Sequence, residues 1–193
     1  MAQTSTSILS SKSHKSDVTG TDISFEASGS VYKITSTSTA LNNFAVRDLI
    51  SVTGTSSNNK SFTVKTVTDA NELIVEEIAT TENADGSTTT TLDHVGFVSD
   101  KQKGDGYYSK PDGVHTVSYK VDATMNIEAT LKMQGSLATT PTEDDWFDVS
   151  STTPTLDQST TIFSYNFTGN FVWVRAKVQG VTAGSVENIL LNS

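Results

Sequence analysis

The chain has 193 residues, among them 31 Thr and 26 Ser, and 18% of its residues are charged. The branched Cβ of Thr favours strands and Ser favours turns, so this composition indicates an all-β protein with polar outer faces. The formal net charge of -9 argues against direct binding to nucleic acid. The absence of cysteine excludes disulfides, thiolate nucleophiles and cysteine-ligated metals.

No apolar run approaches the ~18 to 20 residues of a membrane-spanning helix. The N-terminus also lacks the apolar stretch of a secretory signal peptide. We therefore expect a soluble chain that is made in the cytoplasm and has no membrane partner.

Residues 1–20 carry only three sizeable apolar side chains, Ile8, Leu9 and Val18, among Ser, Thr and Lys. Such a segment cannot build a core by itself, so we expect an extended N-terminal arm. The arm is either disordered or ordered on a neighbouring subunit. In the second case Ile8 and Leu9 are its expected anchors.

Residues 21–100 contain short alternating segments separated by turn residues at the spacing of a small sandwich or barrel. Five strands are expected: Ile23–Glu26, Val31–Ile34, Leu49–Val52, Phe62–Val67 and Leu73–Glu76. Five strands in about 55 residues favour a small β-barrel domain.

Lys101–Gly106 is charged, glycine-rich and free of large apolar residues, so it is the expected linker between two domains. Residues 101–193 then form a second domain. Its alternating segments fit an antiparallel β-sandwich with one buried and one solvated face. Six strands are expected there: Val114–Val121, Met125–Met133, Trp146–Val149, Ile162–Phe167, Phe171–Val178 and Val186–Leu191.

The strongest alternation lies in the segment Gly169–Val178. Because strand side chains alternate between faces, Phe171, Trp173 and Arg175 should share one side of this strand. Trp173 stands at the centre of the segment, and we expect it to be a core residue.

No catalytic or metal-binding pattern emerges. The three histidines, His14, His94 and His115, lie far apart in the sequence, and we expect them to be structural or exposed to solvent. The acidic run Glu143–Asp145 lacks the spacing of a calcium loop and fits a solvated turn better. Nucleophile-elbow and phosphate-loop motifs are absent. We therefore expect a protein that is not an enzyme and has no cofactor.

Aromatic residues outside the expected core are the remaining candidates for a binding surface. Tyr107 and Tyr108 lie beside the expected linker, and Trp146 follows three acidic residues. We expect these three side chains to contact a partner, either a protein or the apolar face of a sugar ring.

Two regions resemble small β-modules of tailed-bacteriophage virion proteins. In the first half the resemblance is carried by Asn43–Thr55 and Asn58–Val67, which match a pattern of the form "Phe, small, apolar, Gly-Asp" followed by "Asn-Asn-Gly, aromatic-Thr". Arg47 and Lys60 stand where the modules have glycine. In the second half it is carried by Thr124–Ala129, Gln134–Leu137, the Trp146 strand and Gly169–Ala176.

The resemblance implies a structural protein of the virion, assembled in the cytoplasm of the host bacterium, with no catalytic residues. We favour a capsid decoration (cement) protein that binds the major capsid protein through its arm and β-domains. A tail, neck or baseplate component that binds tail subunits is the alternative, and either is expected to be a homo-oligomer. A second class is a carbohydrate-binding or adhesion module, and the third and least favoured is a glycan depolymerase.

Overall fold

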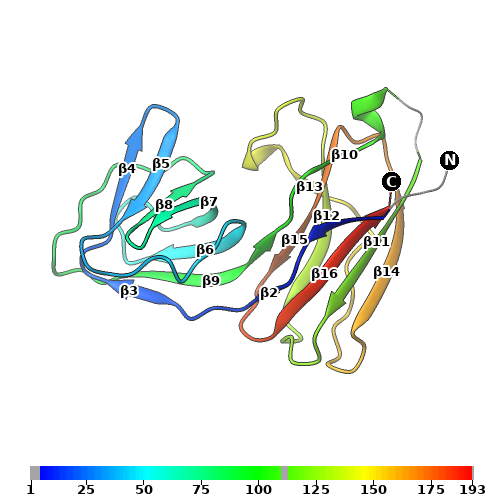
Figure 1. Ribbon diagram of the computed structural model, residues 1–193. Helices are drawn as coiled ribbons and strands as arrows, with labels where there is room; N and C mark the ends of the chain where they lie inside the picture. The colour runs from blue at the N-terminus through cyan, green and yellow to red at the C-terminus, as the bar shows by residue number, and fades with distance from the viewer. Residues whose placement is uncertain (1–4, 110–112, 193) are drawn as a thin grey trace. The chain divides into compact units, whose positions relative to one another are not determined.

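The computed structural model describes residues 5–109 and 113–192 and divides into two compact units (Figure 1). Unit 1 combines the N-terminal residues up to His14 with the residues from Phe97 onward, and unit 2 is the continuous segment Lys15–Gly96. The described residues contain antiparallel strands and two short 3₁₀ helices, and no α-helix occurs among them. The expected all-β class is therefore confirmed.

Unit 1 contains two sheets. In the first, β1 (Ser5–Leu9), β16 (Ser185–Asn192), β11 (Val114–Val121) and β14 (Ile162–Thr168) lie side by side in that order, and β2 (Lys12–Ser13) also pairs with β16. The second has the order β13 (Phe147–Asp148), β12 (Thr130–Ser136) and β15 (Trp173–Gln179), with β10 (Gln102–Lys103) also paired to β15. Two 3₁₀ helices accompany these strands: η1 (Asp105–Tyr108) follows β10, and η2 (Glu143–Asp145) lies between β12 and β13.

The core of unit 1 is built from inward-facing residues of both sheets. It includes Val117 and Tyr119 of β11, Leu131 and Met133 of β12, and Val174 of β15. On β15 the small apolar side chains face inward, so Trp173 lies on the outer face and is only partly buried. The expectation that Trp173 is a core residue is therefore wrong, because the register of β15 places Val174, Ala176 and Val178 inside instead.

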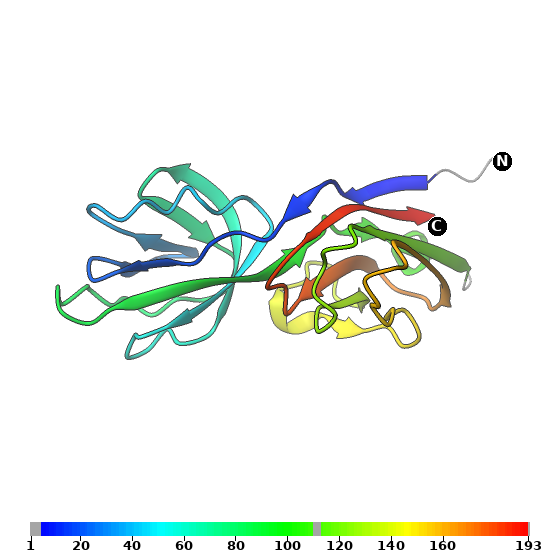
Figure 2. The same cartoon turned by 90° about the horizontal axis from the view of Figure 1, so that it is seen from below.

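The N-terminal segment is a strand of the protein's own sheet. β1 lies beside β16, as Figure 2 shows, and pairs with it in the antiparallel sense, with Thr6 opposite Leu191. Ile8 and Leu9 are only 3% and 5% exposed and belong to the core of unit 1. They are therefore not available to anchor on a neighbour, which corrects the expected free arm for residues 5–9; residues 1–4 lie outside the described part. The local sequence could not reveal this pairing because the partner strand is some 180 residues away.

Unit 2 is a curved set of strands. Its strands are β3 (Val18–Gly20), β4 (Ser24–Ser28), β5 (Val31–Thr35), β6 (Asp48–Thr53), β7 (Ser61–Asp69), β8 (Glu72–Val75) and most of β9 (Thr90–Val98). The first part of β7 pairs with β6 and the second part with β8, so this long strand passes from one group of strands to the next. Phe25, Ile34, Phe62 and Leu73 are among the residues that form its core.

The five strands expected in this region are present as β4 to β8. The expected barrel is not: no sheet closes on itself in the described part of the chain. A single bridge between Phe25 and Glu82 extends the pairing of β4.

The division of the chain also differs from the one expected. The boundaries fall at residues 14/15 and 96/97, whereas the sequence indicated 20/21 and 100/101. Lys101–Gly106 is not a free linker, because Gln102 pairs with Val174 and the backbone N–H of Gly104 donates to the carbonyl of Val172 over 3.0 Å. Among the described residues no helix is long and apolar enough to cross a membrane.

Candidate functional site

An aromatic cluster lies on the outer face of the second sheet of unit 1. We define it as Tyr107, Tyr108 and Trp173 together with Lys101 and Lys103. The Tyr107 ring meets Trp173 edge to face with centroids 5.1 Å apart, and it meets Tyr108 in the same way at 5.3 Å. Tyr107 is 41% and Tyr108 55% exposed. The structure thus unites the two expected tyrosines with a tryptophan 65 positions further on.

The two lysines lie over the rings. The Nζ of Lys101 is 4.8 Å from the centroid of Trp173, and the Nζ of Lys103 is 4.1 Å from that of Tyr107. Lys103 is directly opposite Trp173 in the pairing of β10 with β15. Such cation–π contacts contribute about 0.5–1 kcal/mol at exposed sites.

The backbone holds the cluster firmly in place. Helix η1, which carries both tyrosines, is tied to the start of β15 because the N–H of Gly106 donates to the carbonyl of Phe171 at 2.8 Å. A Cβ at Gly106 would lie 2.7 Å from the carbonyl oxygen of Asn170, so only glycine allows this approach. The indole Nε1 of Trp173 donates to the carbonyl of Thr139 at 3.0 Å.

A buried histidine lies beside the start of η1. His115 is 1% exposed, with its ring centroid 5.1 Å from that of Phe167, so of the two expected roles it has the structural one. Its Nε2 is 3.5 Å from Oδ2 of Asp105, the first residue of η1. The same Oδ2 accepts a hydrogen bond of 2.7 Å from the N–H of Gly113. The carboxylate of Asp105 is therefore engaged in holding the loop.

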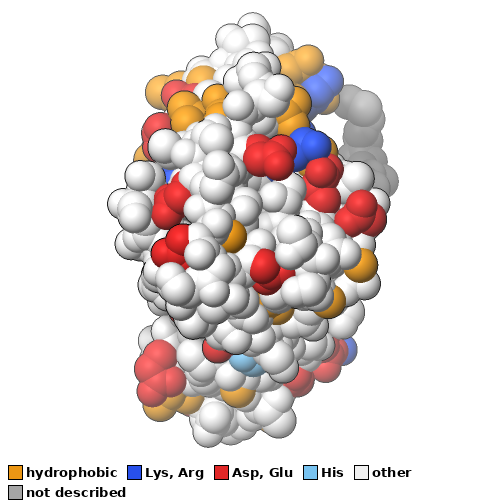
Figure 3. Space-filling model, turned by 90° about the vertical axis from the view of Figure 1, so that its left-hand side faces the viewer, with side chains coloured by type: hydrophobic (Ala, Val, Ile, Leu, Met, Phe, Trp, Pro, Cys, Tyr) orange, Lys and Arg blue, Asp and Glu red, His pale blue; other side chains and the backbone are white. Residues whose placement is uncertain are grey.

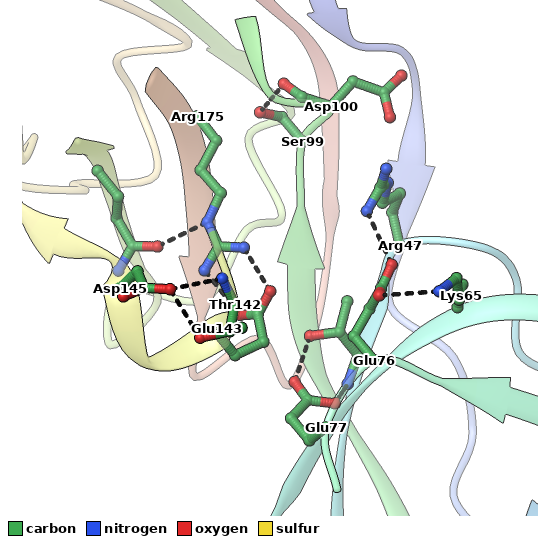
Figure 4. A network of polar contacts seen from close by, with 12 residues as sticks. Arg47, Lys65, Glu76, Glu77, Ser99, Asp100, Thr142, Glu143, Asp145 and Arg175 are labelled. Atoms are coloured by element: carbon green, nitrogen blue, oxygen red, sulfur yellow. Dashed lines mark hydrogen bonds and ion pairs between the residues drawn. The ribbon is translucent and has the colours of Figure 1, made fainter. Parts of the chain in front are cut away.

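The third expected residue, Trp146, has a different role. Its ring covers the guanidinium of Arg175, with Cζ 4.1 Å from the ring centroid. Arg175 is 4% exposed and binds Glu143 through two hydrogen bonds of 2.7 Å, and its Nε donates to Gln134 at 3.0 Å (Figure 4). This arrangement satisfies a nearly buried charge, and its contacts are those of a structural ion pair.

The acidic run beside it is occupied by similar structural contacts. Asp145 caps η2 by accepting hydrogen bonds from the backbone N–H and the hydroxyl of Thr142, which together lower the pKa of its carboxyl group. Glu143 is bound to Arg175. Within residues 5–109 and 113–192 no group of three or more acidic or histidine side chains is placed to hold a metal ion.

Unit 2 contains a polar hollow. It is lined by Ile23, Phe25, Gly54–Ser56, Glu82–Asp85, Thr88 and Thr90. Its carboxylate, Glu82, accepts hydrogen bonds from the backbone N–H groups of Ser56 and Ser57 and from the side chain of Asn58. Burial alone would raise the pKa of Glu82, but these hydrogen bonds outweigh it and lower the pKa. The carboxylate of Glu82 is thus occupied by hydrogen bonds within unit 2.

A second surface feature is the open edge, which we define as strand β14. Its seven residues pair with seven consecutive residues of β11 without a bulge, and β14 ends the strand order of its sheet in the described part of the chain. Phe163 and Tyr165 pack partly against the core, and Ile162 is 58% exposed. The strand contains no charged residue and no proline.

Comparisons with protein-family models, with curated protein sequences and with solved structures found no match to this chain.

Proposed function

We propose that this protein is a structural component of a tailed-bacteriophage virion, in the first place a capsid decoration protein, that attaches to its neighbours through the open edge. The observation that carries the proposal is the unprotected state of β14. The resemblance of residues 43–67 and 124–176 to virion β-modules supplies the biological setting.

An edge strand presents a row of backbone N–H and C=O groups on its free side, which can pair with a strand of another chain. Soluble proteins protect such edges with charged residues, proline or bulges. β14 has none of these, and it combines regular register with aromatic side chains. A free monomer would gain nothing from this arrangement, whereas an assembled particle covers the edge with a partner strand.

The outer face beside the edge fits the same role. Thr116, Ser118 and Asn166 are among the small uncharged side chains of the paired strands β11 and β14. The exposed apolar residues Val114 and Leu190 lie on this sheet as well. Figure 3 shows another face of the molecule, where Asp and Glu are scattered among uncharged side chains and form no single charged patch.

In this proposal unit 1 is an antiparallel sandwich that provides the attachment. The major capsid protein is the expected neighbour, and a tail, neck or baseplate subunit is the alternative. Many identical weak contacts on a symmetric particle add up to stable attachment. A homo-oligomer through the same edge is compatible with such symmetry.

Copy number on purified particles separates these locations. Quantitative mass spectrometry combined with electron cryomicroscopy should find hundreds of copies on the shell of a decorated capsid. A few dozen copies or fewer would move the protein to the neck or tail. Absence from particles would reject the proposal.

Substitution of the edge tests the attachment itself. Ser164→Lys places a charge on an exposed position of β14, which should reduce incorporation into particles by about tenfold or more. Ser30→Lys, at an exposed turn of unit 2, adds the same charge away from the edge and should leave incorporation unchanged. Equal incorporation of both variants, with both folded by circular dichroism, would overturn the role of the edge.

A further inference from the structure

We infer that the aromatic cluster of unit 1 is a binding site for an anionic polysaccharide. This inference goes beyond the structural role, because attachment through β14 makes no use of Tyr107, Tyr108 or Trp173. A virion protein that carries such a site could hold the particle on a polymer at the surface of a host cell.

The cluster has the construction of a ligand platform. Two exposed tyrosine rings and a partly buried tryptophan lie in contact and form an apolar surface, and such surfaces mark interaction sites. These rings sit on a backbone that β10, η1 and β15 hold by pairing and by direct hydrogen bonds. A rigid surface loses little conformational entropy on binding, which favours affinity.

The rings favour a carbohydrate. Sugar rings have apolar C–H faces edged by hydroxyl groups, and aromatic side chains with polar tips fit both parts. The hydroxyls of Tyr107 and Tyr108 provide the polar tips. Trp173 is fixed by its hydrogen bond to Thr139 and offers the largest ring of the three.

The two lysines of the cluster favour a negatively charged ligand. The chain has 13 Lys and Arg against 22 Asp and Glu, so two lysines over one cluster are a local departure from an acidic background. Their Nζ atoms lie over the rings of Trp173 and Tyr107. Because an exposed cation–π contact is weak, a carboxylate or sulfate can draw each ammonium group away from its ring. The ring faces are then open for the sugar that carries the charge.

One acid in the same segment as the lysines has partners of its own. Asp105, at the start of η1, has its Oδ2 bound to the N–H of Gly113 and 3.5 Å from Nε2 of His115. The side chain of Asp105 is therefore committed to the loop and not to the lysines.

A polysaccharide fits better than a nucleic acid. Affinity for nucleic acid depends on many simultaneous phosphate contacts, and the cluster offers only two lysines. A polyuronate offers apolar ring faces to the aromatic side chains, which a phosphate backbone lacks.

The test measures binding of the full chain to alginate by isothermal titration calorimetry, with dextran as the neutral polymer and a thymidine oligonucleotide as the other polyanion. We expect binding to alginate that weakens as salt rises, and weaker binding to both other probes by about tenfold or more. No binding to alginate, equal binding to dextran, or tighter binding to the oligonucleotide would each overturn the inference.

Variants then locate the site. Tyr107→Ala should weaken alginate binding by about tenfold, and the double variant Lys101→Gln, Lys103→Gln should remove both the binding and its salt dependence. Lys120→Gln is the matched control, because Lys120 lies on the other sheet of unit 1, bound to Glu187 at 2.7 Å. An unchanged affinity of the double variant, or an equal loss in the control, would place the binding elsewhere. Particle incorporation of Tyr107→Ala and of the double lysine variant should stay normal, which separates this result from the role of β14.

Discussion

The two units are both all-β, but the chain supplies their strands in different ways. In unit 2 neighbouring strands pair through short turns, as in β4 with β5 and β7 with β8. In unit 1, strands from opposite ends of the chain pair with each other: β1 pairs with β16, and the Ser7 hydroxyl donates to the Asn188 side chain 181 positions away. Several pairs in unit 2 are therefore joined by short turns, whereas the strands of unit 1 pair over long separations in the sequence.

Loss of a buried side chain in β1 is expected to have the largest effect. Leu9→Ala should destabilise unit 1 by about 2–5 kcal/mol, because the side chain is 5% exposed in its core. Both tryptophans, Trp146 and Trp173, lie in unit 1, so their fluorescence during denaturant unfolding reports on this unit. Leu190→Ala, on β16 and partly exposed, is the control and should change stability much less. Equal shifts for both variants would contradict the role of β1.

A turn of unit 2 should be the next most sensitive place. Gly54 has a φ of 81°, and a Cβ there would lie 2.1 Å from the carbonyl oxygen of Thr89. Gly54→Ala should therefore destabilise unit 2 by about 2–3 kcal/mol. Gly29 also has a positive φ, but a Cβ there would meet no atom within 4 Å. Gly29→Ala should therefore destabilise unit 2 by only about 1 kcal/mol. Peptide-level hydrogen exchange over residues 15–96 measures both. Similar exchange in the two variants would show that the contact with Thr89 does not matter.

Acid should weaken unit 2 through Asp22. Its carboxylate accepts hydrogen bonds from the Thr39 hydroxyl, from the hydroxyl and N–H of Ser38, and from Thr37, and these hold its pKa well below the usual value. A lowered folded-state pKa means that the stabilisation is complete above the unfolded-state pKa of about 3.9 and is lost as the pH falls from there through the folded value.

Asp22→Asn should thus destabilise unit 2 at pH 7 by less than Gly54→Ala does. The difference from the natural protein should narrow below about pH 4, because Asn does not titrate. Hydrogen exchange of residues 15–96, measured from pH 7 to below pH 4, gives this difference in stability at each pH. A difference that stays constant with pH would exclude the carboxylate as its source.

Substitutions at Arg47 and Lys60, where the virion β-modules have glycine, should have the smallest effects on stability. Arg47 has a φ of 73°, whereas Lys60 does not have a positive φ. Arg47→Gly relieves about 1 kcal/mol of backbone strain but loses an ion pair with Glu76 at 3.7 Å, shown in Figure 4, so its net effect should lie within about 1 kcal/mol of zero.

Lys60→Gly removes the cation–π contact with Phe62 and relieves no strain, so it should be destabilising by about 0.5–1 kcal/mol. Thermal unfolding of the two variants compares them directly. A lower melting temperature for Arg47→Gly than for Lys60→Gly would contradict the assignment of strain to Arg47.

The same contrast between the units explains what the sequence could predict. The strands of unit 2 were predictable because each alternating segment is followed by its partner after a turn. The absence of a closed barrel was not predictable, because whether a set of strands closes depends on pairing that no local pattern specifies. Ile8 and Leu9 looked like free anchors because their core partners come from strands near the other end of the sequence.

The candidate site was predictable in part for a similar reason. Tyr107 and Tyr108 stood out as aromatic residues in a polar segment. Trp173 and the two lysines joined them only through the register of β10 with β15, in which Lys103 lies opposite Trp173. Trp146 was chosen by the same local argument, but the charge of Arg175 attracts it into a structural contact.

The pairing of β1 with β16 also sets an order of events during synthesis. All residues of unit 2 have been joined once the ribosome passes Gly96, whereas β1 has no partner until β16 has been translated. At typical elongation rates this interval lasts on the order of 5 to 20 s. Throughout it the apolar residues Ile8 and Leu9 lack their native partner strand, and a nascent chain in this state is a natural substrate for a chaperone.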